Sequence, residues 1–317
     1  MDITPEIRQR IEALAEKFNV MGQDMVSYLD GLLHADYLTY WDYIHLDTLL
    51  SLQTPRTPFP DEYIFITYHQ ITELYFKLCL QAAAQLRTRT DPDLAFFKRQ
   101  LERINRYFDN LIHSFDVMIE GMDRQEFLQY RMSLLPASGF QSVQYRMIEI
   151  VSTDFINLVH ADARDQHHWN SEIKALYEDV YWRHGGLELA TGQKTLTLRQ
   201  FELKYSERLL RLGERMRTAN IWQLYRRLPV AEQADPELVR LLKTHDFNIC
   251  VRWRLAHYRS AARYLDRKPK VIEATGGTNW QQYLPPRFQR ISLYPDLWSE
   301  AEKANWGVRV KEFLLEG

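Results

Sequence analysis

The sequence predicts an all-α protein. Apolar residues recur at three- and four-residue spacing through most of the 317 residues, with charged residues between them. No run of alternating Val, Ile and Thr bounded by turns indicates a strand. Gly and Pro, 12 of each, are scarce and gather at a few points in the chain. We therefore expect one all-α helical-bundle domain over residues 1–317; a helical insertion over about 165–230, apart from the core, is the alternative.

Each helical segment is recognised by its period and by the break that follows it. The first is charged and periodic, and the second has an apolar body of Ile64, Tyr68, Ile71, Tyr75 and Leu78. Clusters of Gly and Pro at 53–62, 134–139, 183–186, 275–277 and 284–287 separate the segments. The predicted helical segments are 5–30, 62–87, 93–120, 140–160, 170–182, 197–227 and 236–267.

Composition narrows the class of protein. Lys plus Arg number 40 against 42 for Asp plus Glu, which gives no reason to expect nucleic acid or an anionic membrane as partner. Cys79 and Cys250 are too few for a disulfide framework, the N-terminus lacks the apolar core of a signal peptide, and no run is long enough to span a membrane. We expect a cytoplasmic protein. The aromatic content of 13% suits a core and a flat-ligand pocket equally well.

Several common catalytic signatures are missing from the sequence. There is no GxGxxG after a strand, no Walker loop, no HExxH, no CxxC and no GxSxG. His167 and His168 are adjacent, so on a helix they point about 100° apart. Their polar surroundings favour a solvated helix end over a metal site.

His257 lies on an apolar helical stripe. Cys250, Trp253, Ala261 and Tyr264 share its face at three- and four-residue spacing or its multiples. A histidine in this setting is usually a core residue bonded to a neighbouring carbonyl. The functional alternative is an axial ligand of haem iron, which needs one nitrogen and an apolar slot.

His69 and Arg131 are further candidates, and each has a structural explanation as well as a functional one. His69 follows Phe65 by one turn and is either a satisfied buried histidine or a polar group beside an aromatic ring in a pocket. Arg131 precedes the helix-ending Pro136. It either pairs with a structural Asp or Glu or holds a ligand carboxylate in a bidentate fork.

The stretch PASGFQSVQYRMIE, residues 136–149, begins with small residues and continues into a helix. Small residues at such a point either turn a corner or let the backbone approach another group closely. The residues alone leave both explanations open.

Five stretches together resemble the tryptophan 2,3-dioxygenase family in order and spacing. They are LTYWDYIHLDTLLSLQTP (38–55), DEYIFITYHQITELYFKL (61–78), FLQYRMSLLPASGFQSVQYRMIE (127–149), WRLAH (253–257) and TGGT (275–278) with the later YL (283–284). The resemblance implies an all-α homotetramer with one haem b in each subunit. It also implies insertion of both atoms of O2 across the indole C2–C3 bond of L-tryptophan to give N-formylkynurenine, as in the kynurenine pathway.

The resemblance also implies roles for individual residues. His257 matches the axial haem ligand, and Ser138, Gly139 and Tyr145 match the loop and helix against the haem. His69 matches the histidine that bonds the indole N–H, and Arg131 the arginine that binds the substrate carboxylate. The remaining matches to the substrate site are Phe65 against the indole, Thr275 at the amino-acid end, Phe127 and Leu134 in the wall, and Tyr40 and Tyr43, which the family donates from a neighbouring subunit.

Two departures from the family pattern keep other activities in view. The family's GTGGSSG reads ATGGTNW at 274–280, and Phe127 stands where many members have Tyr. A haem-dependent monooxygenase of tryptophan, a substituted tryptophan or another aromatic amino acid is one alternative. A non-catalytic haem- or indole-binding sensor is the other.

Overall fold

The structure, a computed structural model, describes residues 3–89, 93–188, 191–265 and 284–307. These residues are largely helical and contain no strand longer than the isolated bridges of Val159 with Val180 and Leu187 with Lys194. The predicted all-α fold is confirmed. None of the described helices combines the length and apolar character needed to cross a membrane.

The chain divides into two compact units, residues 1–54 and 55–317. That the whole chain forms one domain stays a prediction. The smaller unit contains α1 (Pro5–Val20), α2 (Met25–Leu33), α3 (Tyr40–Tyr43) and α4 (Leu46–Leu50). The prediction of one helix over 5–30 is wrong in the middle, where Gly22 adopts a φ of +66°. Asp24 then caps α2 by accepting hydrogen bonds from the backbone N–H groups of Val26 and Ser27.

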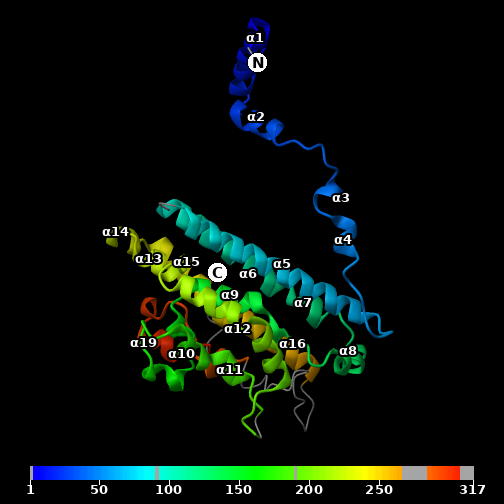
Figure 1. The fold of residues 1–317 in the computed structure, drawn as a ribbon, viewed down its shortest axis with the longest axis vertical. Coiled ribbons are helices and arrows are strands. Elements are labelled where there is room, and N and C mark those ends of the chain that lie inside the picture. The colour runs from blue at the N-terminus through cyan, green and yellow to red at the C-terminus, as the bar shows by residue number, and fades with distance from the viewer. Residues whose placement is uncertain (1–2, 90–92, 189–190, 266–283, 308–317) are drawn as a thin grey trace. The chain divides into compact units, whose positions relative to one another are not determined.

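The larger unit is a layered arrangement of helices in which two long helices, α5 and α6, pack side by side (Figure 1). Its first half contains α5 (Asp61–Thr88), α6 (Leu94–His113), α7 (Phe115–Ile119), α8 (Arg124–Tyr130), η1 (Arg131–Leu134), η2 (Gly139–Gln141), α9 (Val143–Ser152), η3 (Phe155–Leu158) and η4 (Ala161–Gln166). Its second half contains α10 (Ile173–Glu178), α11 (Tyr181–Gly185), α12 (Leu196–Met216), α13 (Ile221–Arg226), α14 (Val230–Gln233), α15 (Pro236–Phe247), η5 (Asn248–Arg252), α16 (Trp253–Leu265), α18 (Pro286–Gln289), η6 (Pro295–Leu297) and α19 (Glu300–Ala304).

Helix α6 shows why these sequences form a bundle. Its apolar residues Phe97, Leu101, Ile104, Phe108 and Leu111 alternate four- and three-residue steps, and all are essentially inaccessible. This stripe lets α6 pack against α5 and α15. Burial of each such side chain contributes about 1.5–3 kcal/mol, so the stripe fixes the positions of the helices around it.

The predicted helix 236–267 contains a break in period that the sequence did not reveal. Residues Asn248–Arg252 form a π-helical segment between α15 and α16. A π-helical turn holds more residues than an α-turn and therefore rotates the helix that follows relative to the helix before it. The segment thus sets which face of α16 points to the interior.

Candidate active site

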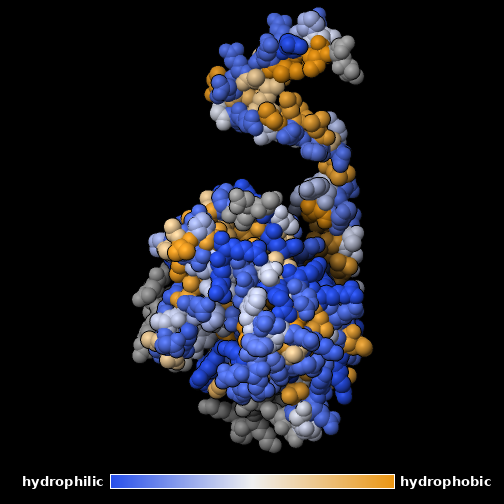
Figure 2. Space-filling view, turned by 60° about the vertical axis from the view of Figure 1, so that its left-hand side comes forward, coloured by the Kyte–Doolittle hydropathy of each residue, from blue (hydrophilic) through white to orange (hydrophobic). Residues whose placement is uncertain are grey.

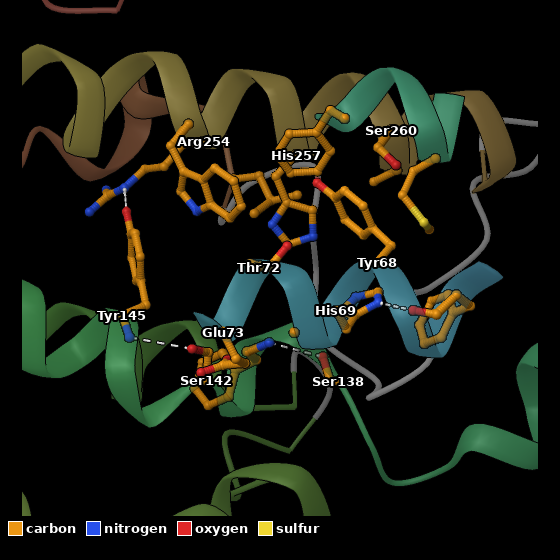
Figure 3. Close-up of a pocket in the computed structure, with 18 of the residues that line it drawn as sticks. Tyr68, His69, Thr72, Glu73, Ser138, Ser142, Tyr145, Arg254, His257 and Ser260 are labelled. Atoms are coloured by element: carbon orange, nitrogen blue, oxygen red, sulfur yellow. Dashed lines mark hydrogen bonds between the residues drawn. The ribbon is translucent and has the colours of Figure 1, made fainter. Parts of the chain in front are cut away.

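A cavity opens between α5, α9 and α16, with the loop around residues 134–142 along one side (Figure 3). The cavity has a volume of about 220 Å³. Eight of the residues singled out from the sequence line this one cavity: Phe65, His69, Phe127, Leu134, Ser138, Gly139, Tyr145 and His257.

His257 projects from α16 towards α5 (Figure 3). Burial lowers its pKa to about 4, and the neighbouring His69 and Arg146 act in the same direction. The ring of Phe115 stacks near it, with 6.0 Å between centroids and 24° between planes. No hydrogen bond joins its ring to any of the described residues, so a neutral nitrogen remains available to a bound group.

Residues 138–141 bring backbone close to His257. Ser138 and Gln141 form a reciprocal capping box around η2, and Gln141 Nε2 donates to the carbonyl of Thr197 at 3.2 Å. A Cβ added to Gly139 would lie 3.5 Å from Cε1 and 3.8 Å from Nε2 of His257. The loop is therefore a close approach of backbone to the histidine as well as a corner.

His69 lies on α5 with its ring against that of Phe65, at a centroid distance of 4.1 Å. Its Nδ1 is 2.7 Å from the Phe65 carbonyl oxygen, which can only accept, so the proton of the neutral ring is assigned to Nδ1. Burial lowers the pKa of His69, and the Phe65 carbonyl and Glu73 oppose that shift. A neutral His69 thus offers Nε2 as a hydrogen-bond acceptor.

Tyr145, which lines the cavity, is held against the π-helical segment. Tyr145 donates from its hydroxyl to the carbonyl of Ile249, at 2.9 Å, within that segment. Trp253, Ala261 and Tyr264, which share the predicted face of His257, all line the cavity. Cys250 is buried but is not among the lining residues, because the change of helical phase lies between it and His257.

Arg131 is not among the residues that line the cavity. Arg131 is buried in η1 one turn before Leu134, and burial lowers its pKa. Tyr40 and Tyr43 belong to the smaller unit and are strongly exposed, at 70% and 74%. Thr275 lies outside the described residues.

The structure adds wall residues that the sequence analysis did not single out. Tyr68 and Thr72 of α5 both place buried hydroxyl groups on the cavity wall. Thr72 lies three residues after His69 and four after Tyr68, and this helical spacing is the signal that could have identified Thr72. Ser260 and Arg254 occupy the positions three residues after and before His257, and both also line the cavity.

The two adjacent histidines have other partners. His167 Nε2 lies 2.7 Å from Asp179 Oδ2, and His168 contacts the hydroxyl of Ser171. Within the described ranges, no group of three or more His, Cys, Asp or Glu side chains is arranged to hold a metal ion.

Comparison with known proteins identifies the family. The tryptophan 2,3-dioxygenase family model matches residues 32–183. The tryptophan 2,3-dioxygenase of Ruegeria sp. strain TM1040 is 30% identical over 84% of this chain and 92% of its own length. The chain belongs to the tryptophan 2,3-dioxygenase family. Other relatives are the tryptophan 2,3-dioxygenase of Bradyrhizobium sp. strain BTAi1, 32% identical over 82% of this chain and 91% of its own, and tryptophan 2,3-dioxygenase 1 of Ralstonia nicotianae, 31% identical over 82% and 86%.

The tryptophan 2,3-dioxygenase family is haem-dependent and uses O2. The residues of the cavity fit such a group in three respects. His257 is neutral and free to coordinate, Gly139 leaves open the space that a Cβ would fill beside Nε2, and aromatic rings supply an apolar slot. The hydroxyl groups of Tyr68 and Thr72 give the same wall polar atoms.

Proposed function

We propose that this protein is a haem-dependent dioxygenase that cleaves the indole C2–C3 bond of L-tryptophan with O2 and releases N-formylkynurenine. The observation that carries the proposal is one cavity lined by two neutral histidines from different helices. His257 offers a nitrogen to iron, and His69 offers an acceptor to an indole N–H. Family membership links this arrangement to tryptophan.

His257 would hold the iron of haem b. When bound, the haem supplies the redox-active iron that activates O2. As a neutral imidazole, His257 gives the iron a weaker electron push than a thiolate ligand would, and this favours use of intact O2 over early O–O cleavage. Its low pKa keeps it deprotonated and able to coordinate throughout the neutral range.

His69 and Phe65 would orient the substrate. The Nδ1–H bond to the Phe65 carbonyl fixes the ring of His69 and leaves Nε2 to accept the indole N–H. The Phe65 ring, half-buried at the wall, provides a flat apolar surface for the indole. Because the indole is electron-rich, positioning of this kind contributes more than a strong base would. His69 is therefore proposed as the catalytic histidine in an orienting role.

Arg131 and Thr275 are proposed to bind the amino-acid end of the substrate. Arg131 is buried with a pKa lowered by desolvation, which is a setting that an anionic carboxylate would stabilise. Thr275 is assigned by the resemblance alone. Together they would explain a preference for a free α-amino acid.

The smaller unit is proposed to complete the site of another subunit in a homotetramer. None of the side chains in residues 3–54 is buried, and hydrophobic residues gather on the surface of this unit (Figure 2). A large exposed apolar surface of this kind marks an interaction site. Tyr40 and Tyr43 would then be covered by the neighbour whose cavity they line. A cytoplasmic location belongs to the same proposal.

The deciding experiment is a single-turnover reaction. Haem-loaded protein is reduced without air, mixed with L-tryptophan and then exposed to ¹⁸O2. The proposal expects N-formylkynurenine carrying two labelled oxygen atoms. A product with one labelled atom would replace it with the monooxygenase, and bound haem without any product would replace it with the sensor. Light scattering of the same sample measures whether the particle has four subunits.

The monooxygenase is kept as the second candidate because of Phe127. This residue lines the cavity and packs its ring against Tyr264 at 4.7 Å, so a hydrocarbon edge stands where many family members carry a hydroxyl. Phe127→Tyr should move the product ratio if the missing hydroxyl controls the outcome. An unchanged product would remove this reason for the second candidate.

A further inference from the structure

A buried cluster of charged groups forms part of the cavity wall beyond Tyr145. Its members are Arg146 and Glu149 of α9, Tyr181 of α11 and Arg254 of α16. Both guanidinium groups are nearly inaccessible and Glu149 is fully so. Arg146, Tyr181 and Arg254 line the cavity, while Glu149 lies behind them. The function described above assigns no role to this cluster.

Its hydrogen bonds hold the two arginines in fixed positions. Arg254 Nη2 donates to Glu149 Oε1 at 3.0 Å and to the Tyr181 hydroxyl at 2.7 Å. Arg146 Nη1 donates to Glu149 Oε2 at 3.2 Å and to the same hydroxyl at 2.8 Å. The Arg254 guanidinium also lies over the Tyr181 ring, 4.7 Å from its centroid. Guanidinium groups held in this way are preorganised to bind an anion.

Arg254 has a buried donor that can accept an anion as its partner. One carboxylate, that of Glu149, is shared between two guanidinium groups. Arg254 Nη1 is buried and has no hydrogen-bond partner among the described residues. A buried charge whose partner is shared costs several kcal/mol unless another group compensates it. A carboxylate entering from the cavity would accept from Nη1 and balance the charge.

The position of Arg254 restricts which molecule carries that carboxylate. Arg254 and His257 are three residues apart on α16, so their Cβ atoms lie roughly 5–6 Å apart on one face of the helix. Figure 3 shows both side chains projecting from this helix on the same side. An anion bound at Arg254 can therefore be part of a molecule that His257 also holds. Haem carries two propionate carboxylates at one edge of its ring.

We propose that Arg254, held in place by Glu149, Tyr181 and Arg146, binds a propionate of the haem and so sets the orientation of the ring on His257. The inference rests on the proposed function, because it requires that haem is the bound group. It adds a second attachment point for the haem and assigns the far end of the cavity to the cofactor. The substrate carboxylate would then be left to other residues.

The test compares haem with its dimethyl ester, in which both propionates are uncharged. Apo-protein is titrated with each pigment. The dissociation constant is read from the Soret band, and the dissociation rate constant is read from transfer of the pigment to a scavenger protein. The variants are Arg254→Met and, as a matched control, Arg252→Met. Arg252 is two residues away and donates to Asp109 Oδ1 at 2.6 Å, and it is not on the cavity wall. Circular dichroism and thermal unfolding establish that each variant is folded.

We expect Arg254→Met to weaken haem binding by about 10- to 100-fold, the equivalent of a charge-assisted hydrogen bond. Esterification should weaken binding to the wild-type chain by a similar factor. The two changes together should cost no more than esterification alone, since esterification already removes the contact that Arg254 makes. Arg252→Met should bind both pigments as the wild-type chain does.

Fully additive losses, or equal binding of haem and its diester by the wild-type chain, would overturn the assignment. The ester comparison needs no variant and so decides the matter even if Arg254→Met does not fold. A higher KM for tryptophan in Arg254→Met with unchanged haem affinity would instead place the substrate carboxylate here. If the wild-type chain shows no Soret band with either pigment, the proposed function itself fails.

Discussion

Replacing Gly139 with valine should damage haem binding far more than it damages the fold. A Cβ at this position would meet Cε1 of His257 at 3.5 Å and Nε2 at 3.8 Å, which are ordinary contact distances in the chain as it stands. Gly139 is also not among the residues with positive φ, so a side chain imposes no backbone strain. The free energy of unfolding of the apo-protein should therefore differ from that of the wild-type chain by no more than about 0.5 kcal/mol.

The effect on haem binding follows from where those atoms lie. A coordinated iron needs the space beyond Nε2 of His257, and the Cβ of a valine at position 139 would already lie 3.8 Å from that nitrogen before its two γ-methyl groups are added. Forcing extra methyl groups into a filled site costs about 1–3 kcal/mol. At 1.4 kcal/mol for each factor of ten, haem should bind about 5- to 150-fold more weakly.

Gly213 provides the matched control with the opposite expectation. A Cβ there would lie 2.8 Å from Ile173 Cγ2 and 2.9 Å from Phe155 Cε2, so Gly213→Ala overpacks the interior. It should lower the melting temperature by about 2–4 °C for each kcal/mol lost while sparing the haem affinity of the folded fraction. The assays are thermal unfolding of the apo-proteins and Soret titration. If Gly139→Val binds haem normally, or loses as much stability as Gly213→Ala, the close-approach explanation of the loop is wrong.

Three further predictions follow from the same geometry. His257→Ala should abolish the Soret band while leaving the far-ultraviolet circular dichroism unchanged, and the exposed His168→Ala should retain both; a retained band in His257→Ala would remove the axial assignment. Arg131→Ala should raise KM for tryptophan at least about tenfold without lowering haem content, and an unchanged KM would exclude the carboxylate role. His245, buried against the Tyr294 hydroxyl at 2.7 Å, has a pKa lowered by burial to about 3. Below about pH 6.5 the unfolded chain binds a proton at His245 that the folded chain does not bind. The free energy of unfolding should therefore fall as the pH drops from about 6.5 towards 3, by about 1.4 kcal/mol per pH unit from this group. Urea unfolding at several pH values should show a weaker dependence of this free energy on pH for His245→Gln, and an equal dependence would refute the prediction.

Much of the larger unit could be predicted because its helices have strong periods. The stripe of α6 repeats without interruption, and its neighbours pack where the stripe requires. The smaller unit was predicted less well, because Gly22 ends α1 in a segment whose period continues on both sides. Local period reports which residues share a face, but a single residue in a left-handed conformation changes the direction of the chain without changing the period.

The cavity shows a second limit of sequence patterns. His257 was identified as part of an apolar stripe, and its neighbours Ala261 and Tyr264 do line the cavity because α16 is regular beyond Trp253. Cys250 was predicted to share this face on the assumption that the helix is α-helical throughout. The π-helical segment breaks the α-helical spacing between Cys250 and His257, so that prediction does not hold.

The sequence pattern did not indicate a role for Arg254, for a related reason. A charged residue beside an apolar stripe is ordinarily read as the edge of a solvated face, and only the tertiary contacts with Glu149 and Tyr181 show that it is buried. Those two residues come from different helices, 105 and 73 positions earlier in the chain. No local spacing contains that information. The surroundings of Arg254 are therefore defined by the side chains that α9 and α11 place against α16, and its buried donor Nη1, which has no hydrogen-bond partner among the described residues, is the physical signal that marks it.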